Sequence, residues 1–327
     1  MNAVVYTEYG PPDVLQLKEV EKPAPTDGEA LVRVHAASVN YSDWSFLRGR
    51  PSMVRLMGAG LLRPENPILG ADIAGRVEAV GEHVEQFQPG HEVFGDISDC
   101  GYGGFAEYVS VPETALALKP ANIGFDGAAA VPQAAAVALQ GLRDKGGIQP
   151  GQRVLIVGAS GGVGTFAVQI AKSYGAEVTG VCSTRNLELV QSIGADHVID
   201  YTQEDFAENE GRYDLILATA GYRSIFDYRR ALGTSGTYVS TGGAMAQTMQ
   251  AALIGPWLST GGKKMGPLAS TTDLKDLVHL RELVEKGKVV PVIDRRFQLG
   301  EVPEALRYYG KGHARGKVVI VIHKGDG

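Results

Sequence analysis

A glycine-rich loop is the first segment of this chain whose residue types point to chemistry. Gly158-Ala159-Ser160-Gly161-Gly162-Val163-Gly164 follows an apolar run and leads directly into a segment with helical character. Small residues let the backbone approach a pyrophosphate, and the start of the following helix supplies N–H groups and a partial positive charge. A strand before, a helix after and a second strand ending about 20 residues on are the context that this fingerprint requires. We therefore predict a dinucleotide site, rather than a purely structural turn, at Ala159, Ser160, Gly161, Gly162, Val163 and Gly164.

The residues after the second strand indicate which dinucleotide binds. An NAD site places an acid at the end of this strand, against the ribose hydroxyls, but this chain has Val181-Cys182-Ser183-Thr184-Arg185 there. A carboxylate would repel a 2′-phosphate, whereas Ser183 can donate a hydrogen bond to it and Arg185 can bind it through two N–H groups. We expect NADPH, although an arginine in an exposed loop is also common. Tyr201, which ends the third strand, is a further candidate for this phosphate.

A later strand-like run, 237–243, also ends in small residues. Because open parallel sheets bind ligands at the carboxyl ends of their strands, we expect Thr241, Gly242 and Gly243 to flank the nicotinamide. Gly221 and Lys317 are weaker candidates for the same place.

These motifs require a parallel sheet, and the second half of the chain predicts one. The apolar runs 154–158, 177–182 and 197–201 alternate with helical segments at 164–174 and 186–193. Unbroken hydrophobic strands that alternate with helices are typical of an α/β fold in which a doubly wound parallel sheet has helices on both faces.

The first part of the chain has a different character. Short strand-like runs at 30–37, 73–80, 91–94 and 106–111 are separated by Gly and Pro, which favours a β-rich, barrel-like unit. Helices are expected at the Ala-rich segment 126–142 and at 273–286, and a last strand at 317–322.

Composition excludes several classes of protein. The chain has 327 residues, 44% hydrophobic and 21% charged, as in an ordinary globular protein. A net charge of −6 without a basic stripe argues against nucleic-acid binding. No apolar run approaches the roughly 18 residues of a membrane span, and Glu8 comes too early for a signal peptide, so we expect a cytoplasmic protein. Cys100 and Cys182 fit a reducing compartment and cannot form a four-cysteine zinc site.

Several motifs resemble those of the medium-chain dehydrogenase/reductase superfamily, in particular its zinc-free quinone oxidoreductase branch. Val39-Asn40-Tyr41-Ser42-Asp43, with Gly49 later, resembles the VNxxD…G segment, and residues 67–75 resemble the PxxxGxDxxG signature. The segment 87–93 and the ending 316–319 also match.

The resemblance covers nearly the whole chain and implies its domain organisation. A GroES-like catalytic domain formed from both chain ends, residues 1–124 and 271–327, is expected around a central Rossmann domain at 125–270. Members are usually dimers or tetramers, so we expect a homodimer.

Zinc-dependent members of the superfamily place a cysteine, a His-Glu pair and a second Cys or His at three sites. The corresponding positions here hold Asn40, Ala71-Asp72 and Gln133, and none provides a soft ligand. The seven histidines are scattered without ligand spacing. We therefore expect no metal and reject a zinc alcohol dehydrogenase.

The absence of zinc ligands limits the chemistry. Without a Lewis acid the oxidation of an unactivated alcohol is hard, because nothing stabilises the alkoxide that develops. The reduction of an electron-poor acceptor is easier. Hydride from NADPH can add to the β-carbon of an α,β-unsaturated ketone, or to a quinone. The protein must then hold the acceptor and stabilise a developing enolate oxygen. We predict an NADPH-dependent reductase of enones or quinones.

The segment that matches the family supplies the predicted lining of the substrate pocket. Asn40 offers an amide donor to a carbonyl oxygen, and Tyr41 is a donor, a proton source or a packing residue. Asp43 is expected to orient its neighbours, and Phe46 to form an apolar wall.

Two features bear on the substrate. Enoyl-thioester reductases of the superfamily carry a proton-donating tyrosine shortly after the glycine that corresponds to Gly49, whereas Arg50-Pro51 follow here, which disfavours a fatty-acid enoyl substrate. Residues 52–63 are apolar, Met-rich and helix-like, and they either cover the pocket or belong to the core.

Two other classes of function are alternatives. A non-catalytic NADPH-binding protein, structural or sensing, is consistent with the lack of an unambiguous general acid. Nucleic-acid binding is opposed by the acidic balance of the chain.

Overall fold

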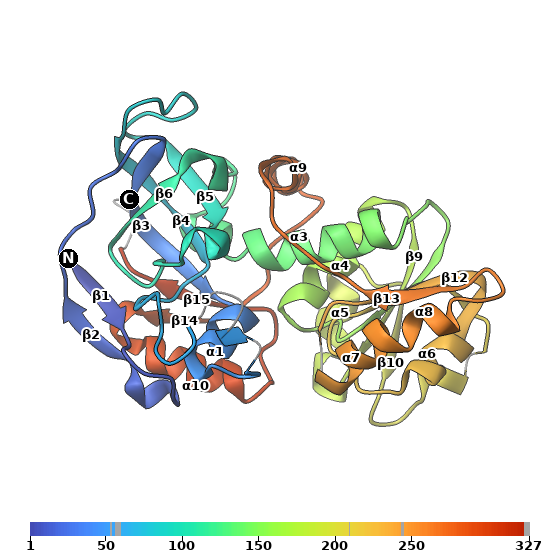
Figure 1. Cartoon of the computed structure of the whole chain (residues 1–327). Coiled ribbons are helices and arrows are strands. Elements are labelled where there is room, and N and C mark those ends of the chain that lie inside the picture. The colour runs from blue at the N-terminus through green and yellow to red at the C-terminus, as the bar shows by residue number, and fades with distance from the viewer. Residues whose placement is uncertain (53, 56–59, 209, 243–244, 324–327) are drawn as a thin grey trace. The chain divides into compact units, whose positions relative to one another are not determined.

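The computed structural model describes residues 1–52, 54–55, 60–208, 210–242 and 245–323. These residues form two compact units (Figure 1). The split unit contains 1–133, 272–285 and 291–327, and the central unit contains 134–271 and 286–290. The first boundary thus follows Gln133, beyond the predicted position at residue 124, and a short segment after the helix predicted at 273–286 joins the central unit.

A seven-stranded sheet forms the centre of the split unit. Its strands, in spatial order, are β14 (Ile293–Gln298), β15 (Lys317–Val321), β3 (Glu29–Val39), β4 (Asp72–Val80), β5 (Glu92–Asp96) and β7 (Leu116–Leu118), with β6 (Tyr108–Pro112) also paired to β3. Val318 of β15 pairs antiparallel with Val39 of β3. The two ends of the chain therefore build one sheet, as the resemblance implies.

Smaller elements complete the split unit. They are the antiparallel pair β1 (Asn2–Val5) and β2 (Gln16–Glu19) and the helices α1 (Tyr41–Arg48), α2 (Phe125–Ala129), α9 (Leu274–Glu285) and α10 (Val302–Gly310). Helix α1 begins directly after β3, and Asp43 in its first turn accepts a hydrogen bond from the backbone N–H of Asn40 at 2.8 Å. This reciprocal cap fixes where the helix starts.

The central unit contains a six-stranded sheet in which every strand pair is parallel. Its spatial order is β10 (His197–Asp200), β9 (Glu177–Cys182), β8 (Arg153–Val157), β11 (Tyr213–Ala218), β12 (Leu232–Ser240) and β13 (Lys264–Pro267). Numbered from β8, this is the order 3-2-1-4-5-6 of a Rossmann fold, which reverses direction between β8 and β11. The predicted doubly wound sheet is confirmed.

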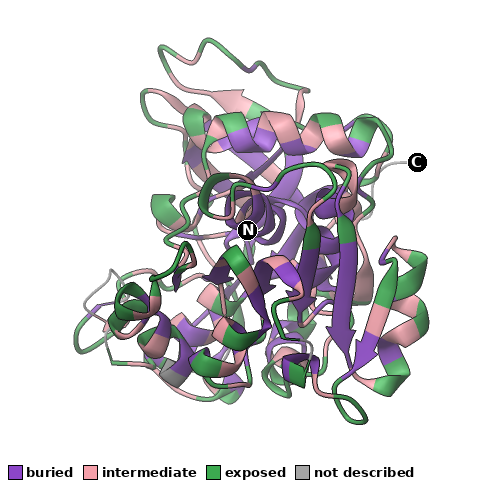
Figure 2. Ribbon diagram, turned by 90° about the vertical axis from the view of Figure 1, so that its right-hand side faces the viewer, coloured by how far each residue is buried: buried purple, intermediate pink, exposed green. Residues whose placement is uncertain are grey.

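The central strands of this sheet are largely buried, and Figure 2 shows exposed residues mainly on helices and loops of the molecule. The helices of the central unit are α3 (Pro132–Gln140), α4 (Gly162–Ser173), α5 (Leu187–Ser192), α6 (Ile225–Ala231), α7 (Met245–Leu253) and α8 (Gly255–Leu258). In the described part of the chain, none of the helices has both the length and the apolar character needed to cross a membrane.

The segment 126–142 is helical over most of its length, as predicted, but it is divided into several pieces. The segment contains α2, α3 and a π turn at Gly141–Lys145. Pro132 lacks a backbone N–H and cannot continue a helix, but it is favoured at the first helical position, where α3 begins. The break follows from this proline, which the Ala-rich composition obscured.

Candidate functional site

The glycine loop of the central unit has the shape that a dinucleotide needs. It connects β8 to α4, and Gly158 adopts a left-handed backbone with φ of +84°. A Cβ on Gly164 would lie 2.0 Å from the carbonyl oxygen of Gly158, so only glycine fits between helix and loop. A Cβ on Gly161 would meet nothing nearer than 3.4 Å. The loop backbone at Gly161 is therefore open to a ligand at the start of α4, and the residues present fit a pyrophosphate.

The predicted phosphate-binding residues lie at the next strand end. Ser183 follows β9, and Arg185 is exposed in a 3-10 turn at Thr184–Asn186. Asn186, which sequence reasoning missed, donates from Nδ2 to Oγ of Ser160 at 2.9 Å and to Oγ of Ser183 at 3.3 Å. Both predicted serines therefore belong to one hydrogen-bonded group. Tyr201 is half-exposed, and its ring centroid lies 5.4 Å from that of Tyr222.

A carboxylate that the sequence reasoning did not consider lies close to this turn. Asp200 ends β10, pairs in register with Cys182, and is buried. Oγ1 of Thr184 donates to it at 2.5 Å, and the N–H and hydroxyl of Thr202 also donate. The hydrogen bond from Thr184 is the main cause that lowers the pKa of Asp200. The carboxylate accepts from the protein itself, and it holds the turn that carries Arg185.

The ends of β11 and β12 also meet as expected. The backbone N–H of Thr241 donates to the carbonyl oxygen of Ala218 at 2.9 Å. Gly221 is buried, and its N–H points to the carbonyl oxygen of Gly242 at 3.5 Å. Both strands end at the edge where the glycine loop lies, and the place of these residues beside the nicotinamide stays a prediction. Gly243 falls outside the described residues.

A buried polar cluster in the split unit brings together Asn40, Asp72 and Lys317. Lys317 is 3% exposed, and its Nζ donates to Oδ1 of Asn40 at 2.5 Å and to Oδ2 of Asp72 at 3.3 Å. Nδ2 of Asn40 donates to the same Asp72 oxygen at 2.9 Å, as does the hydroxyl of Ser38 at 3.0 Å. The ammonium of Lys317 lies in this cluster because β15 pairs with β3, and its predicted place beside the nicotinamide stays a prediction.

The three positions that correspond to zinc ligands in other members of the superfamily lie close together. The backbone N–H of Gln133 donates to Oδ1 of Asp72 at 3.0 Å, which links the third position to the Asn40 cluster. Ser42 donates to the side-chain oxygen of Gln133 at 3.1 Å. In this chain the buried cation among these side chains is the ammonium of Lys317.

Burial controls the titration of the two aspartates nearby. It raises the pKa of Asp72 to about 6, against the opposing effect of Lys317. It also raises the pKa of Asp43 to about 7. Asp43 accepts from the backbone N–H groups of Asn40 at 2.8 Å and Gly70 at 2.9 Å, which favour its charged form. Asp43 thus joins the start of α1 to the loop before β4.

The other predicted pocket residues lie on α1. Tyr41 is 58% exposed. Phe46 is partly buried and packs against the hydrophobic core of the split unit, and its ring centroid lies 4.9 Å from that of Tyr102. The predicted cover at 52–63 lies partly outside the described residues; Leu61 and Leu62, which are described, are exposed.

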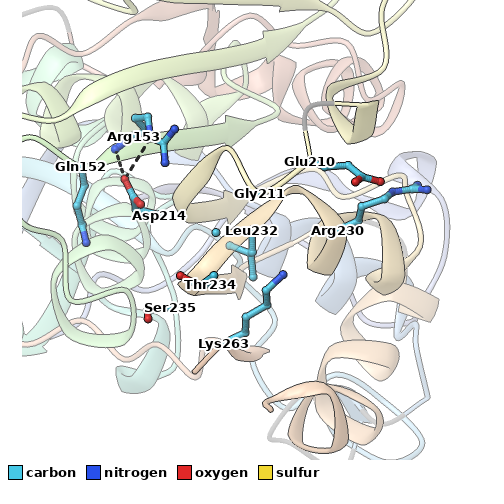
Figure 3. A pocket seen from close by; sticks show the side chains of 11 residues that line it. Gln152, Arg153, Glu210, Gly211, Asp214, Arg230, Leu232, Thr234, Ser235 and Lys263 are labelled. Carbon is cyan, nitrogen blue, oxygen red and sulfur yellow. Dashed lines mark hydrogen bonds and ion pairs between the residues drawn. The ribbon is translucent and has the colours of Figure 1, made fainter. Parts of the chain in front are cut away.

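A cavity of about 560 Å³ in the central unit is a different feature (Figure 3). It lies at the amino ends of β8, β11 and β12, whereas parallel sheets bind ligands at the carboxyl ends. Its cations are engaged by the protein: Arg153 pairs with Asp214, Arg230 pairs with Asp227, and Lys263 donates to the carbonyl of Arg229. We do not assign the dinucleotide to this cavity.

Comparison with known proteins agrees with the two units. Residues 26–121 match the family described as Alcohol dehydrogenase GroES-like domain, and residues 193–320 match the family described as Zinc-binding dehydrogenase. The latter description does not extend to metal ligands here, since the three corresponding positions hold Asn40, Asp72 and Gln133.

Relatives extend the agreement over the whole chain. A 2-methylene-furan-3-one reductase of Solanum lycopersicum is 35% identical over 98% of this chain and 79% of its own length. A chloroplast envelope quinone oxidoreductase homolog of Arabidopsis thaliana is 32% identical over 98% of both. The structure of the quinone oxidoreductase from Coxiella burnetii aligns with a TM-score of 0.88, at 29% identity over 99% of both chains.

The chain therefore belongs to the medium-chain dehydrogenase/reductase superfamily, in its zinc-free quinone oxidoreductase branch, and is an oxidoreductase that uses a nicotinamide cofactor. The predicted GroES-like and Rossmann folds are confirmed.

Proposed function

We propose that the protein uses NADPH to reduce the activated double bond of an α,β-unsaturated ketone, or a quinone. The names of the relatives support this substrate class, since they include a 2-methylene-furan-3-one reductase and quinone oxidoreductases. The observation that carries the proposal is the fixed amide of Asn40. Lys317 holds its oxygen, and Asp72 takes one of its two N–H groups.

This arrangement makes Asn40 a hydrogen-bond donor. The ammonium has no acceptor atom, so the amide oxygen must face it and Nδ2 must face Asp72. The second N–H of Nδ2 has no partner among the described residues, and Asn40 is 6% exposed. We assign this N–H to the carbonyl oxygen of the acceptor, where it stabilises the negative charge that develops.

The reaction adds a hydride and a proton to the acceptor. The reduced dinucleotide, when bound at the glycine loop, supplies the hydride. Tyr41, exposed at the start of α1, is our proposed source or relay of the proton. Asp43 positions Asn40 through the backbone hydrogen bond at 2.8 Å, and Phe46 provides an apolar wall.

The preference for NADPH over NADH is supported by the residues after β9. The position that carries an acid in NAD sites is followed here by Ser183 and Arg185. We propose further that the protein is a homodimer and that it lies in the cytoplasm. Its partner is a small electrophile and not a nucleic acid. The edge position of β13 in its sheet is consistent with pairing between copies.

The experiment that tests this function is NADPH consumption, followed by near-ultraviolet absorbance, with a small enone and with a quinone. The protein is treated with a chelator beforehand, and NADH is run in parallel. Fast loss of NADPH with little loss of NADH supports the proposal. Tight NADPH binding without turnover of any activated acceptor would instead support a non-catalytic, sensing protein.

A further inference from the structure

Asn186 is a buried polar side chain that the proposed chemistry does not use directly. It ends the 3-10 turn after β9, and its backbone N–H donates to the carbonyl of Ser183 at 2.8 Å. The residue is 5% exposed, although it lies in a polar loop directly after the exposed Arg185. A buried asparagine in such a loop requires an explanation from its contacts.

Its amide joins two loops that belong to different strands. Nδ2 donates to Oγ of Ser160, in the glycine loop after β8, at 2.9 Å, and to Oγ of Ser183, after β9, at 3.3 Å. An amide nitrogen carries two N–H groups, so both are used. A hydroxyl oxygen that accepts such a bond still has its own O–H, which it can donate to another acceptor. The two serines therefore present O–H groups that cannot point back at Asn186.

The oxygen of the same amide indicates that the position of Asn186 lowers the stability of the fold. Oδ1 of Asn186 is buried and has no partner among the described residues. Buried acceptors are paired in most proteins, and an unpaired one lowers stability. Turning the amide over would leave two N–H groups unpaired instead of one oxygen and would draw both hydroxyl protons inward. The observed orientation is thus the one that leaves the hydroxyls as donors.

We propose that Asn186 is a positioning residue that sets the hydroxyls of Ser160 and Ser183 as paired donors to the 2′-phosphate of NADPH. The phosphate is an acceptor of hydrogen bonds, so it needs donors on this side, and Arg185 supplies the charge. Asn186 then acts on cofactor selectivity without touching the cofactor. This inference rests on the proposed use of NADPH.

The direct test replaces the donor amide by an acceptor of the same shape. Asn186→Asp accepts the serine protons, turns both hydroxyls inward and adds a negative charge. The readout is binding of 2′,5′-ADP and of 5′-AMP by calorimetric titration, because the two fragments differ by the phosphate concerned. We expect affinity for 2′,5′-ADP to fall about 30-fold or more, as for loss of charge-assisted hydrogen bonds, and affinity for 5′-AMP to change less than about twofold.

Two further variants complete the design. Gln191→Glu makes the same chemical change at an exposed position of α5 and should leave both fragments unaffected. Asn186→Ala removes the amide without adding charge, and it should weaken 2′,5′-ADP binding about 5- to 10-fold. The alanine variant also tests the proposal if the aspartate variant fails to fold.

The outcomes separate the two proposals. If the wild-type protein binds both fragments equally, the assignment of NADPH is wrong. If the wild type prefers 2′,5′-ADP and the Asn186 variants keep that preference, the role of Asn186 is wrong while the function stands. Equal loss of both fragments in the Asn186 variants would also overturn the proposal, because it would show a general structural role.

Discussion

The ammonium of Lys317 lies 2.5 Å from the side-chain oxygen of Asn40, although 277 residues separate the two in the chain. The contact exists because the last strand of the sheet pairs with β3, where Ser38 and Val39 precede Asn40. It determines which way the Asn40 amide faces, and it places a buried positive charge beside Asp72. The catalytic and the stability properties of the split unit should therefore depend on the same few atoms.

Asn40→Ala should lower kcat for enone reduction about 100-fold, because it removes a donor to the developing oxyanion. The dissociation constant for NADPH should stay within about twofold, since that ligand is assigned to the central unit. Stopped-flow and steady-state assays give both values. Asn122→Ala serves as the control, because Asn122 donates to the carbonyl of Val284 in the same unit. A kcat close to wild type in Asn40→Ala would remove Asn40 from the mechanism.

Lys317→Met should lower the free energy of unfolding by about 3–5 kcal/mol, since it leaves the carboxylate of Asp72 buried without its cation. Adding Asp72→Asn should recover much of this loss, because the unpaired charge is then gone. Urea denaturation of the two single variants and the double variant forms a complete cycle. Additive losses would mean that the two side chains do not interact as the 3.3 Å distance implies.

Local patterns in the sequence were sufficient to predict the strands, helices and glycine loop of the central unit. The glycine loop, the apolar strands and the small residues after them each occupy a few adjacent positions, and the parallel sheet was predicted from the alternation of strands with helices. The order of its strands came only from the structure. The helical character of 126–142 was also predicted from its composition, but the break before Pro132 was not.

Contacts between distant segments could not be predicted in the same way. The family resemblance identified Asn40, Asp72 and Gln133, but no local pattern shows that Lys317 reaches them. Asn186 resembles an ordinary turn asparagine in the sequence. Only the parallel register of β8 and β9, with Val157 opposite Val181, shows that two loops meet at its side chain.

Asp43 and Asp72 should each make the protein less stable as pH rises from about 4 to about 8. Burial raises the pKa of Asp43 to about 7 and that of Asp72 to about 6, so the native state keeps protons that the unfolded chain has released. The contribution of these two carboxyl groups to the unfolding free energy should decrease as pH rises through their native pKa values and level off above about pH 8. Urea midpoints measured across these pH values test the slope, which Asp43→Asn should reduce. An equal slope in that variant would exclude Asp43 as a contributor.

Two glycines of the cofactor loop should respond differently to alanine. Gly164→Ala places a Cβ 2.0 Å from the carbonyl oxygen of Gly158 and should destabilise the protein by about 2–4 kcal/mol. Gly161 has φ of −83°, and a Cβ added there would meet no atom nearer than 3.4 Å. The free energy of unfolding of Gly161→Ala should therefore stay within about 0.5 kcal/mol of wild type. It should nevertheless weaken NADPH binding about tenfold, because the methyl group occupies space reserved for the pyrophosphate. Thermal unfolding and fluorescence titration separate the two effects, and unchanged binding in Gly161→Ala would place the pyrophosphate elsewhere.

Arg185→Ala should raise the KM for NADPH by about 10- to 100-fold, the amount expected from losing charge-assisted hydrogen bonds to a phosphate. The KM for NADH should change little, because NADH lacks that phosphate. Lys288→Ala removes an exposed positive charge elsewhere in the central unit. It controls for the effect of net charge on the electrostatic attraction of an anionic cofactor. The preference of the wild type for NADPH should also shrink as salt rises, since screening weakens an exposed pair. Equal changes in the two KM values would show that Arg185 supports the loop itself and does not read the phosphate.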